Sequence, residues 1–397
     1  MKNILLITTL YPIFTKENRT TYVCHYFARD WVKLGYNVRV IHIQPEYNIF
    51  VKKLIFLKGK ITKITPLGGY IYESCLDDVE HYVHDAVSIY RIPMHKFLPR
   101  NNFTDREIKK IGEKIDAIFK SENFVPDLIT CHMLQWNIAP IINEQNKYHA
   151  KLCMVLHGCL SSYLYQRNRN WISKYNILGF RSKYMKEAFE KINTINTKSF
   201  ICYSGIPENY IITSNHRSFS HNINTFIYVG ALIQRKYPER ILPALNESYK
   251  KDNYTLTIIG KGEMHDTIEV LAQKLNISDK VRFMGQQTRE EIIQLYDAAD
   301  CMIMISKNEA YGLVYLEAMA RGCITIASRN EGIDGVIIDG YNGFLCESGN
   351  STELSQILTR IRNSTQEELL RISNNAIMTA RHFTDITTAK SYIDNLK

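Results

Sequence analysis

Short apolar runs alternate along the chain with longer segments in which apolar residues recur every three or four positions. The first forty residues contain an apolar run at 4–8, a segment with Val23, Phe27 and Trp31 at helical spacing, and a second apolar run at 38–43. Runs of this length are typical of buried strands, and the spaced pattern is typical of an amphipathic helix. The pattern therefore predicts a β-α-β unit and a parallel sheet.

The same alternation continues to about residue 205. Thr104 and Glu107 form a capping-box pair ahead of a helical pattern, and apolar runs follow at 127–130 and 152–156. Thr followed three residues later by Glu is a signal for the start of a helix. We predict an open α/β domain over the N-terminal half.

The pattern lapses between residues 199 and 224, where polar and turn-forming residues dominate, and then restarts. We predict an N-terminal domain over 1–205, a linker over 206–224 and a second domain that begins at 225. Both domains are expected to be Rossmann-like and doubly wound and to face each other across a cleft, where ligands bind in this architecture. The second domain has predicted strands at 226–229, 255–259, 281–284 and 301–305.

Bulk composition agrees with two soluble domains. A chain of 397 residues with 45% apolar and 22% charged residues is too long for one ordinary core and is typical of a globular protein. The apolar start ends at Tyr11 and Pro12 without a cleavage site, and no stretch reaches the roughly 18 uninterrupted apolar residues of a membrane span. Nine cysteines without a C-x-x-C pair argue against a disulfide framework or a thiolate zinc site. We expect a cytoplasmic protein with reduced thiols.

The charge is concentrated in the N-terminal half. The net charge is +9, and residues 1–205 carry 29 Lys and Arg against 17 Asp and Glu. Five lysines between residues 51 and 64 alternate with large apolar side chains, so this segment either lies on an anionic membrane surface or forms a solvated face beside a core strand. Nucleic acid is not an expected partner, because the chain contains no recognisable nucleic-acid-binding module.

The most informative chemistry lies between residues 309 and 322. Glu309 and Glu317 are eight positions apart, with Gly312 between them, and Gly322 is placed to end a helix that begins near Gly312. The free backbone N–H groups at the start of such a helix, over 311–313, form a site for a phosphate group. The two carboxylates could then reach hydroxyl groups on either side of a diphosphate. An isolated pair of glutamates is, however, more often one acid on the surface and one on a helix face, without a binding role.

Two further loops are expected at the same edge of the sheet. Arg235 and Lys236 follow the strand predicted at 226–229, where cations could neutralise phosphate charge on a leaving nucleotide. Gly260 follows the next strand and would permit a close approach of backbone, but the segment has too few glycines for a dinucleotide-binding fingerprint.

These segments, continued to residue 344, resemble the retaining glycosyltransferases of family 4, which have the GT-B fold. The resemblance covers nearly all of 225–397 and, more loosely, the N-terminal half at His157 and Gly158. It implies that Arg235 and Lys236 bind the donor diphosphate and that Glu317 binds the ribose. It also implies that residues 377–397 form a C-terminal helix that crosses back to the first domain, which ends the donor domain at 376.

The resemblance assigns the remaining residues as well. Glu309 would hold the transferred sugar and His157 would contact it near the reacting carbon, although a lone histidine after a strand is otherwise more often structural. No metal is implied, because protein cations would meet the phosphate charge. Arg19 and Thr21 stand where many relatives have Gly, and could compensate for its loss. The expected donor-binding residues are Ala310, Tyr311, Gly312, Leu313, Glu317, Met284, Gly285, Gly260, Arg19 and Thr21.

The expected function is transfer of a hexose-type sugar from a nucleotide diphosphate donor, with UDP favoured, to a glycan or lipid-linked glycan in polysaccharide, capsule or glycolipid assembly. Such an enzyme would be cytoplasmic and could contact the inner face of the cell membrane through its basic N-terminal domain. A nucleotide-sugar epimerase of the same architecture, or a non-catalytic donor-binding scaffold for a partner transferase, remains an alternative. The residues alone fix neither the sugar nor the nucleobase.

Overall fold

The computed structural model describes residues 2–14, 21–47, 75–96, 102–194, 196–219, 223–250 and 252–397. Arg19 and the basic segment 51–64 lie outside the described residues. The chain divides into two compact units. Unit 1 comprises residues 1–181, 185–202 and 389–397, and unit 2 comprises residues 182–184 and 203–388.

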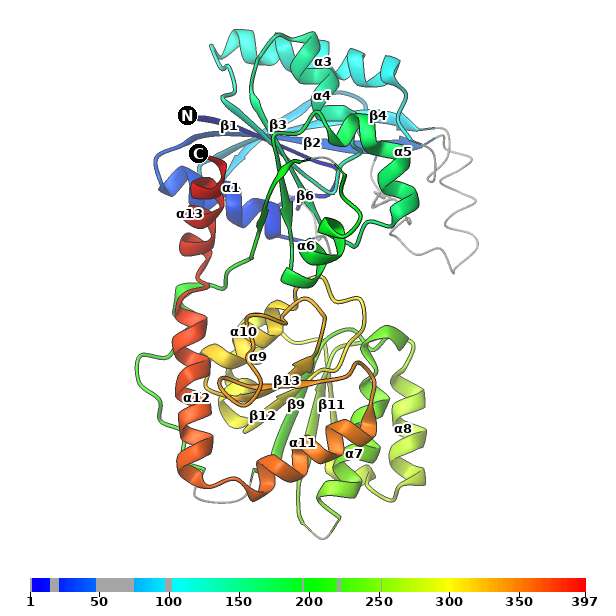
Figure 1. The fold of residues 1–397 in the computed structure, drawn as a ribbon, viewed down its shortest axis with the longest axis vertical. Helices are drawn as coiled ribbons and strands as arrows, with labels where there is room; N and C mark the ends of the chain where they lie inside the picture. Colours follow the sequence, from blue (N-terminus) through cyan, green and yellow to red (C-terminus); the bar gives the residue numbers. More distant parts are fainter. Residues whose placement is uncertain are drawn as a thin grey trace. The chain divides into compact units, whose positions relative to one another are not determined.

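Unit 1 is built on an eight-stranded sheet with the order β3-β4-β2-β1-β5-β6-β7-β8 (Figure 1). All neighbouring strands are parallel except the β3–β4 hairpin. The strands are β1 Asn3–Thr8, β2 Asn37–Tyr47, β3 Glu80–His84, β4 Val87–Lys96, β5 Leu128–His132, β6 Lys151–Leu156, β7 Ile177–Phe180 and β8 Lys198–Ile201. The helices are α1 Val23–Lys33, α3 Asp105–Ser121, α4 Ile138–Gln145, α5 Ser162–Ile172 and α6 Lys183–Glu190.

Strand β1 shows why the sequences of the central strands are apolar at nearly every position. Ile4 and Leu6 pack into one core with residues of α1, and Leu5 and Ile7 pack into a second core with residues of α3 and α4. Successive side chains of a strand point to opposite faces, so a strand covered by helices on both faces must be apolar at every position. The predicted β-α-β unit and α/β class are confirmed.

Unit 2 contains a fully parallel six-stranded sheet with the order β11-β10-β9-β12-β13-β14. Its strands are β9 Thr225–Val229, β10 Thr255–Ile259, β11 Val281–Gly285, β12 Cys301–Ile303, β13 Ile324–Ser328 and β14 Phe344–Cys346. Its helices are α7 Ile241–Ser248, α8 His265–Lys274, α9 Arg289–Ala298, α10 Leu313–Ala320, α11 Ser351–Asn363 and α12 Gln366–Arg381. Short 3-10 turns are η1 Glu208–Tyr210, η2 Gln234–Lys236, η3 Pro238–Arg240 and η4 Ser278–Lys280.

Helix starts follow the sequence closely. Thr104 caps α3 and Thr288 caps α9, each with the reciprocal bond from a glutamate at the third helical position. Each box satisfies backbone N–H groups that have no partner within the helix. A third box at Thr365 begins α12.

The region expected as a linker, 206–224, is part of unit 2 in its described residues. Arg217 explains this, because its guanidinium donates to the carbonyls of Tyr296, Ala299 and Arg321 at 2.5–2.8 Å. One side chain thereby ties the segment to the α9 and α10 ends, which a polar sequence run does not reveal.

The C-terminal region contains two helices where one was expected from residue 377. α12 ends at Arg381 and α13 spans Asp385–Leu396. Between them the Ile206 N–H donates to the Phe383 carbonyl, and the Asp385 N–H donates to the Ile206 carbonyl. These backbone groups of Phe383 and Asp385 would bond within the helix if α12 and α13 were continuous. Residues from Ala389 onward belong to unit 1, where the Trp31 indole donates to the Ala389 carbonyl at 3.1 Å.

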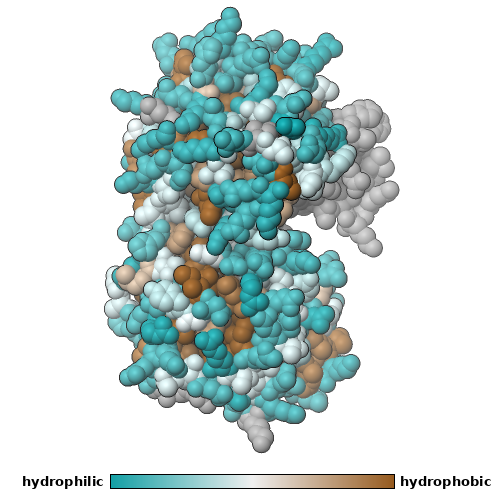
Figure 2. All heavy atoms as spheres, in the orientation of Figure 1, coloured by the Kyte–Doolittle hydropathy of each residue, from teal (hydrophilic) through white to brown (hydrophobic). Residues whose placement is uncertain are grey.

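On the face drawn in Figure 2, the hydrophobic residues of the described part of the chain form patches among hydrophilic ones. Among the helices of the described residues, none is long and apolar enough to cross a membrane.

Candidate functional site

The loops that follow β9 and β12 lie side by side at the carboxyl edge of the unit 2 sheet. These strands are neighbours, and the chain proceeds outward from them in opposite directions, to β10 and β11 on one side and to β13 and β14 on the other. This arrangement is the topological switch point, where open α/β sheets bind their ligands. The β9 loop carries Arg235 and Lys236, and the β12 loop carries Glu309.

The two cations meet the carboxylate directly. Lys236 Nζ lies 3.2 Å and Arg235 Nη1 lies 3.4 Å from Oε2 of Glu309. The side chains of Lys236 and Glu309 are each 13% exposed, whereas that of Arg235 is 43% exposed. Cations held at the end of a parallel sheet in this way are suited to meet a phosphate group. The expected proximity of these three residues is present.

Glu331 is a member of this site that the sequence did not point to. Its Oε2 accepts a hydrogen bond of 2.8 Å from the backbone N–H of Glu309. Burial raises the pKa of Glu331 above its usual value, against the opposing effect of the backbone bonds from Asn308 and Glu309. Glu331 follows β13 and lies 22 residues beyond Glu309, so only the fold brings them together.

Gly312 sets the direction of α10. It has φ +81° at the N-cap, a backbone conformation that side chains other than Gly rarely adopt. A Cβ on Gly312 would lie 2.4 Å from the ring of Tyr315, whose hydroxyl donates to the Met304 carbonyl at 2.7 Å. The first-turn N–H groups of a helix have no partner within it and attract anions. The backbone over 310–313 thus leads into this helix start beside Glu309.

Glu317 lies further along α10 and is half-buried. Desolvation raises its pKa to about 6, and Arg289 of α9 acts in the opposite direction. A half-buried carboxylate is stable in its charged form when hydrogen-bond donors replace the water that burial has removed. This is consistent with the predicted role of Glu317 in binding hydroxyl groups.

The predicted glycine loops are close-packed. Gly260 has φ +140°, and a Cβ there would lie 1.9 Å from the Gly230 carbonyl oxygen, so the loops after β9 and β10 can touch only without a side chain. Gly260 N–H also donates to the Gly285 carbonyl at 2.7 Å, which links the loop after β11. Met284 is 41% exposed there, and Gln287 donates to its carbonyl.

A second cluster of predicted residues lies at the carboxyl edge of the unit 1 sheet. His157 follows β6 and its Nε2 lies 3.0 Å from Nδ1 of His132, the last residue of β5. His132 Nε2 in turn lies 3.1 Å from the hydroxyl of Tyr392 on α13. That hydroxyl also bonds with Thr130. No pattern in the sequence indicates that α13 contacts His132 and, through it, His157.

Burial keeps both histidine rings neutral near pH 7. Desolvation lowers the pKa of His132 to about 3, with Arg181 acting in the same direction. Desolvation also lowers the pKa of His157, and His132 and Arg181 add to this effect. A neutral His157 can present either a donor or an acceptor at Nδ1, depending on its tautomer.

Thr21 lies at the start of α1, where its hydroxyl accepts a 3.4 Å bond from the N–H of Val23. This contact supports the helix start. The expected contribution of Thr21 to phosphate binding stays a prediction.

Part of the chain matches known proteins in sequence. Residues 213–378 match the family model of glycosyl transferases group 1. An uncharacterised glycosyltransferase of Methanocaldococcus jannaschii is 26% identical over 188 residues, which cover 47% of this chain and 49% of that protein. N-acetyl-alpha-D-glucosaminyl L-malate synthase of Bacillus anthracis is 33% identical over 133 residues, which cover 34% of each chain. The chain thus spans about half or less of the length of these relatives.

The fold comparison extends over the whole chain. HepE of Anabaena, solved in complex with UDP, matches with a TM-score of 0.70 and 17% identity over 100% of this chain and 99% of that one. The same protein in complex with UDP-glucose matches with a TM-score of 0.66 and 16% identity over the same shares of the two chains.

Two α/β units, each built on a largely parallel sheet, are the architecture of the GT-B fold. Residues 213–378 thus match the glycosyl transferases group 1 model, and the chain as a whole has the GT-B fold. The resemblance drawn from the sequence is confirmed at this level.

Proposed function

We propose that the chain is a retaining glycosyltransferase that transfers a hexose-type sugar from a UDP-linked donor to a glycan or lipid-linked glycan. The observation that carries this proposal is the contact of Arg235 and Lys236 with Glu309 beside the start of α10. A glycosyl donor presents a diphosphate next to a ring of hydroxyl groups. Paired cations next to a carboxylate are complementary to both parts.

The diphosphate is assigned to the cations and to the backbone at the start of α10. As the bond to the sugar breaks, negative charge grows on the leaving phosphate, and preorganised cations stabilise that charge. Lys236 is held by its burial, and its Nζ also contacts Met304 Sδ at 3.6 Å. In this proposal the protein cations meet the phosphate charge without a metal ion.

The sugar and the ribose are assigned to the two carboxylates. Both cations contact Oε2 of Glu309, so Oε1 can accept hydrogen bonds from sugar hydroxyls. Glu317, farther along α10, would accept from the ribose. Residues near Met284 and Gly285 would face the base, and the UDP bound by HepE supports uracil as that base.

On the acceptor side, His157 is assigned to the sugar near the reacting carbon. Attack from the same face as the departing phosphate would retain configuration, and the leaving phosphate would take the acceptor proton. The neutral His157 ring would then position a hydroxyl group and would not act as a charged acid. The same proposal includes the acceptor and its place in capsule, polysaccharide or glycolipid assembly. It also includes a contact of residues 51–64 with the inner membrane face.

The proposal is tested by measuring UDP release from UDP-glucose and related UDP-sugars, with and without glycan acceptors. Lys236→Ala should reduce donor affinity about 10–100-fold, because bonds to charged groups contribute about 1.5–3 kcal/mol. Lys274→Ala, an exposed lysine at the end of α8, is the matched control. Equal donor affinity in both variants contradicts the site. If the protein converted the donor to its epimer without releasing UDP, the result would favour the epimerase alternative over glycosyl transfer.

A further inference from the structure

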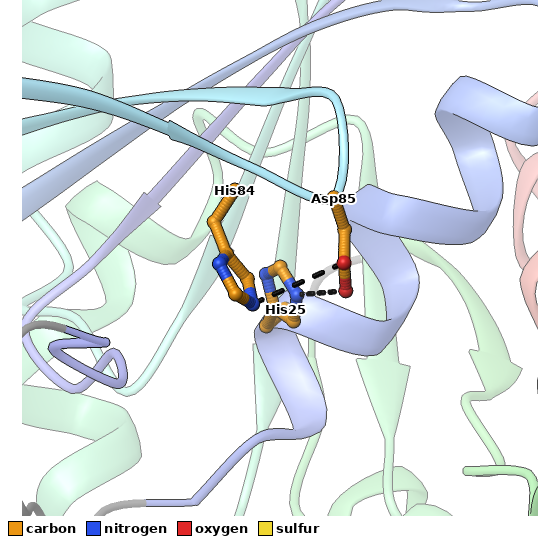
Figure 3. A group of neighbouring side chains, drawn as sticks. All are labelled: His25, His84 and Asp85. Carbon is orange, nitrogen blue, oxygen red and sulfur yellow. Dashed lines mark hydrogen bonds and ion pairs between the residues drawn. The ribbon is translucent and has the colours of Figure 1, made fainter.

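Three potential metal ligands converge in unit 1, and none of them is a residue assigned to glycosyl transfer. His25 lies in the first turn of α1, His84 is the last residue of β3, and Asp85 begins the turn to β4. Figure 3 shows the two imidazole rings and the carboxylate pointing toward one another from these separate elements. One ligand atom from each residue lies within 4.8 Å of the other two.

The distances are compatible with a shared ion. Asp85 Oδ2 lies 3.0 Å from His25 Nε2, and Asp85 Oδ1 lies 3.9 Å from His84 Nε2. Ligands bound at about 2.0–2.1 Å in a tetrahedral site are separated by about 3.3 Å. The two observed separations, which involve different oxygens of Asp85, lie on either side of this value, and one ligand atom from each residue lies within 4.8 Å of the other two.

Tyr11 orients the most buried ligand. Its hydroxyl lies 2.8 Å from Nδ1 of His25, and both residues are almost completely buried. A histidine that binds a metal through one ring nitrogen almost always uses the other for a hydrogen bond that fixes its tautomer. If Nδ1 donates to the Tyr11 oxygen, Nε2 is left with its lone pair directed at Asp85.

Phe14 orients the second histidine. Its ring stacks on His84 with a centroid separation of 3.6 Å and an interplanar angle of 16°. Phe14 also contacts the ring of His25 edge-on at 4.7 Å. One aromatic side chain therefore restricts both imidazoles, which lowers the entropy lost on binding an ion.

The turn that presents Asp85 is the two-residue connection of the β3–β4 hairpin. Asp85 has φ +47° and Ala86 has φ +60°. Positive φ at both central residues is the geometry of a type I′ hairpin turn, and Asp adopts it more readily than most residues. The turn places Asp85 directly after His84, so one hairpin presents both side chains.

We propose that His25, His84 and Asp85 bind a divalent transition metal ion with the preferences of Zn²⁺. Two imidazole nitrogens and one carboxylate oxygen suit this class of ion better than Mg²⁺ or Ca²⁺, which prefer oxygen ligands. The His84 and Asp85 side chains are 40% and 46% exposed, so a bound ion keeps access to solvent for a further ligand. The ion would join α1 to the β3–β4 hairpin.

The test uses the full chain, freed of any histidine tag and treated with a chelator. Co²⁺, which accepts the same nitrogen and oxygen ligands, is titrated while its visible absorption bands are recorded, and Zn²⁺ is then added as competitor. One equivalent of Co²⁺ should produce bands that Zn²⁺ abolishes. His84→Ala and Asp85→Ala, both at partly exposed positions, should lose them, and Tyr11→Phe should weaken binding about 10–100-fold.

Two control variants separate this cluster from other histidines. His81→Ala removes a ring on the same strand that bonds to Ser88 at 2.8 Å and takes no part in the cluster. His265→Ala removes the centre of a second group of His and acidic residues on α8. Both controls should bind Co²⁺ as the parent protein does. Absence of bands, bands that survive His84→Ala and Asp85→Ala, or loss only in His265→Ala would overturn the proposal and leave a plain His25–Asp85 ion pair.

Discussion

The Nδ1 atom of His132 lies 3.0 Å from the Nε2 atom of His157, and Tyr392 of the C-terminal helix contacts the opposite side of the His132 ring. A neutral imidazole donates from one nitrogen and accepts at the other. The orientation of the Tyr392 hydroxyl therefore determines the tautomer of His132, and through it the tautomer of His157. The last helix is thus linked through His132 to His157, the histidine that we propose contacts the sugar.

Tyr392→Phe should therefore change turnover more than donor binding. Loss of one hydrogen bond, worth about 1 kcal/mol, should lower kcat about fivefold, while the donor KM and the folded structure stay close to the parent values. Steady-state kinetics over a range of pH measure both parameters. Trp31→Phe, which removes the indole bond to Ala389 without touching His132, is the control for a mere loosening of α13. Equal kcat losses in the two variants would contradict a specific role for the tyrosine.

Acid should destabilise the protein through the buried histidines. The pKa of His132 is lowered from 6.5 to about 3, so below pH 6.5 the unfolded chain binds a proton that the folded chain does not. The free energy of unfolding should fall by about 1.4 kcal/mol per pH unit for this group as the pH decreases from about 6 toward 3. His132→Asn should reduce that slope in urea titrations at a series of pH values. A slope equal to that of the parent protein would show that His132 is already charged in the fold.

Glu309→Gln should mainly reduce turnover. The amide keeps the shape but loses the charge that fixes Lys236 and Arg235 and accepts from sugar hydroxyls, so kcat should fall at least about tenfold while UDP affinity changes little. Glu331→Gln should give a smaller loss of the same kind, because it acts through the Glu309 backbone. Isothermal titration with UDP and steady-state rates separate the two effects. A large loss of UDP affinity in Glu309→Gln would assign this residue to the nucleotide.

Gly312→Ala should damage both stability and donor binding. Its left-handed backbone costs roughly 1–2 kcal/mol with a side chain, and the added Cβ would also meet the Tyr315 ring at 2.4 Å. Gly35→Ala is the matched control, since Gly35 has φ +86° and open space around the added Cβ. Thermal unfolding should show a larger loss for Gly312→Ala, and only that variant should lose UDP binding. Equal losses of stability and of UDP binding in the two variants would mean that the backbone at the start of α10 can rearrange to accept a side chain at position 312.

Much of the fold could be predicted because local signals coincide with it. The strand expected at 255–259 is β10, and the capping box predicted at Thr104 is present. The strand expected at 301–305 is β12, which spans only Cys301–Ile303, although the Met304 N–H still donates to the Ile326 carbonyl of β13 at 3.1 Å. Periodicity marks where an element lies, but it does not mark the residue at which pairing ends.

The site was only partly predictable, because some of its partners are distant in sequence. Glu309 and Lys236 could be expected at one edge because both follow parallel strands. Glu331 could not be expected, because it contacts Glu309 through a backbone N–H. Tyr392 could not be expected either, because it contacts His132 although the two residues are 260 positions apart in the sequence. The same applies to Arg217, whose three carbonyl partners turn an expected linker into part of unit 2.

The central claim, that the switch point of unit 2 binds a nucleotide diphosphate sugar, is tested most directly by a thermal-shift screen with UDP-, GDP-, ADP-, dTDP- and CMP-sugars. A ligand that binds only the folded state raises the melting temperature. We expect a UDP-sugar to do so in the parent protein and in Lys274→Ala, and the shift to be lost in Glu317→Ala. A folded protein that responds to none of these ligands, or a shift that survives Glu317→Ala unchanged, would contradict the account.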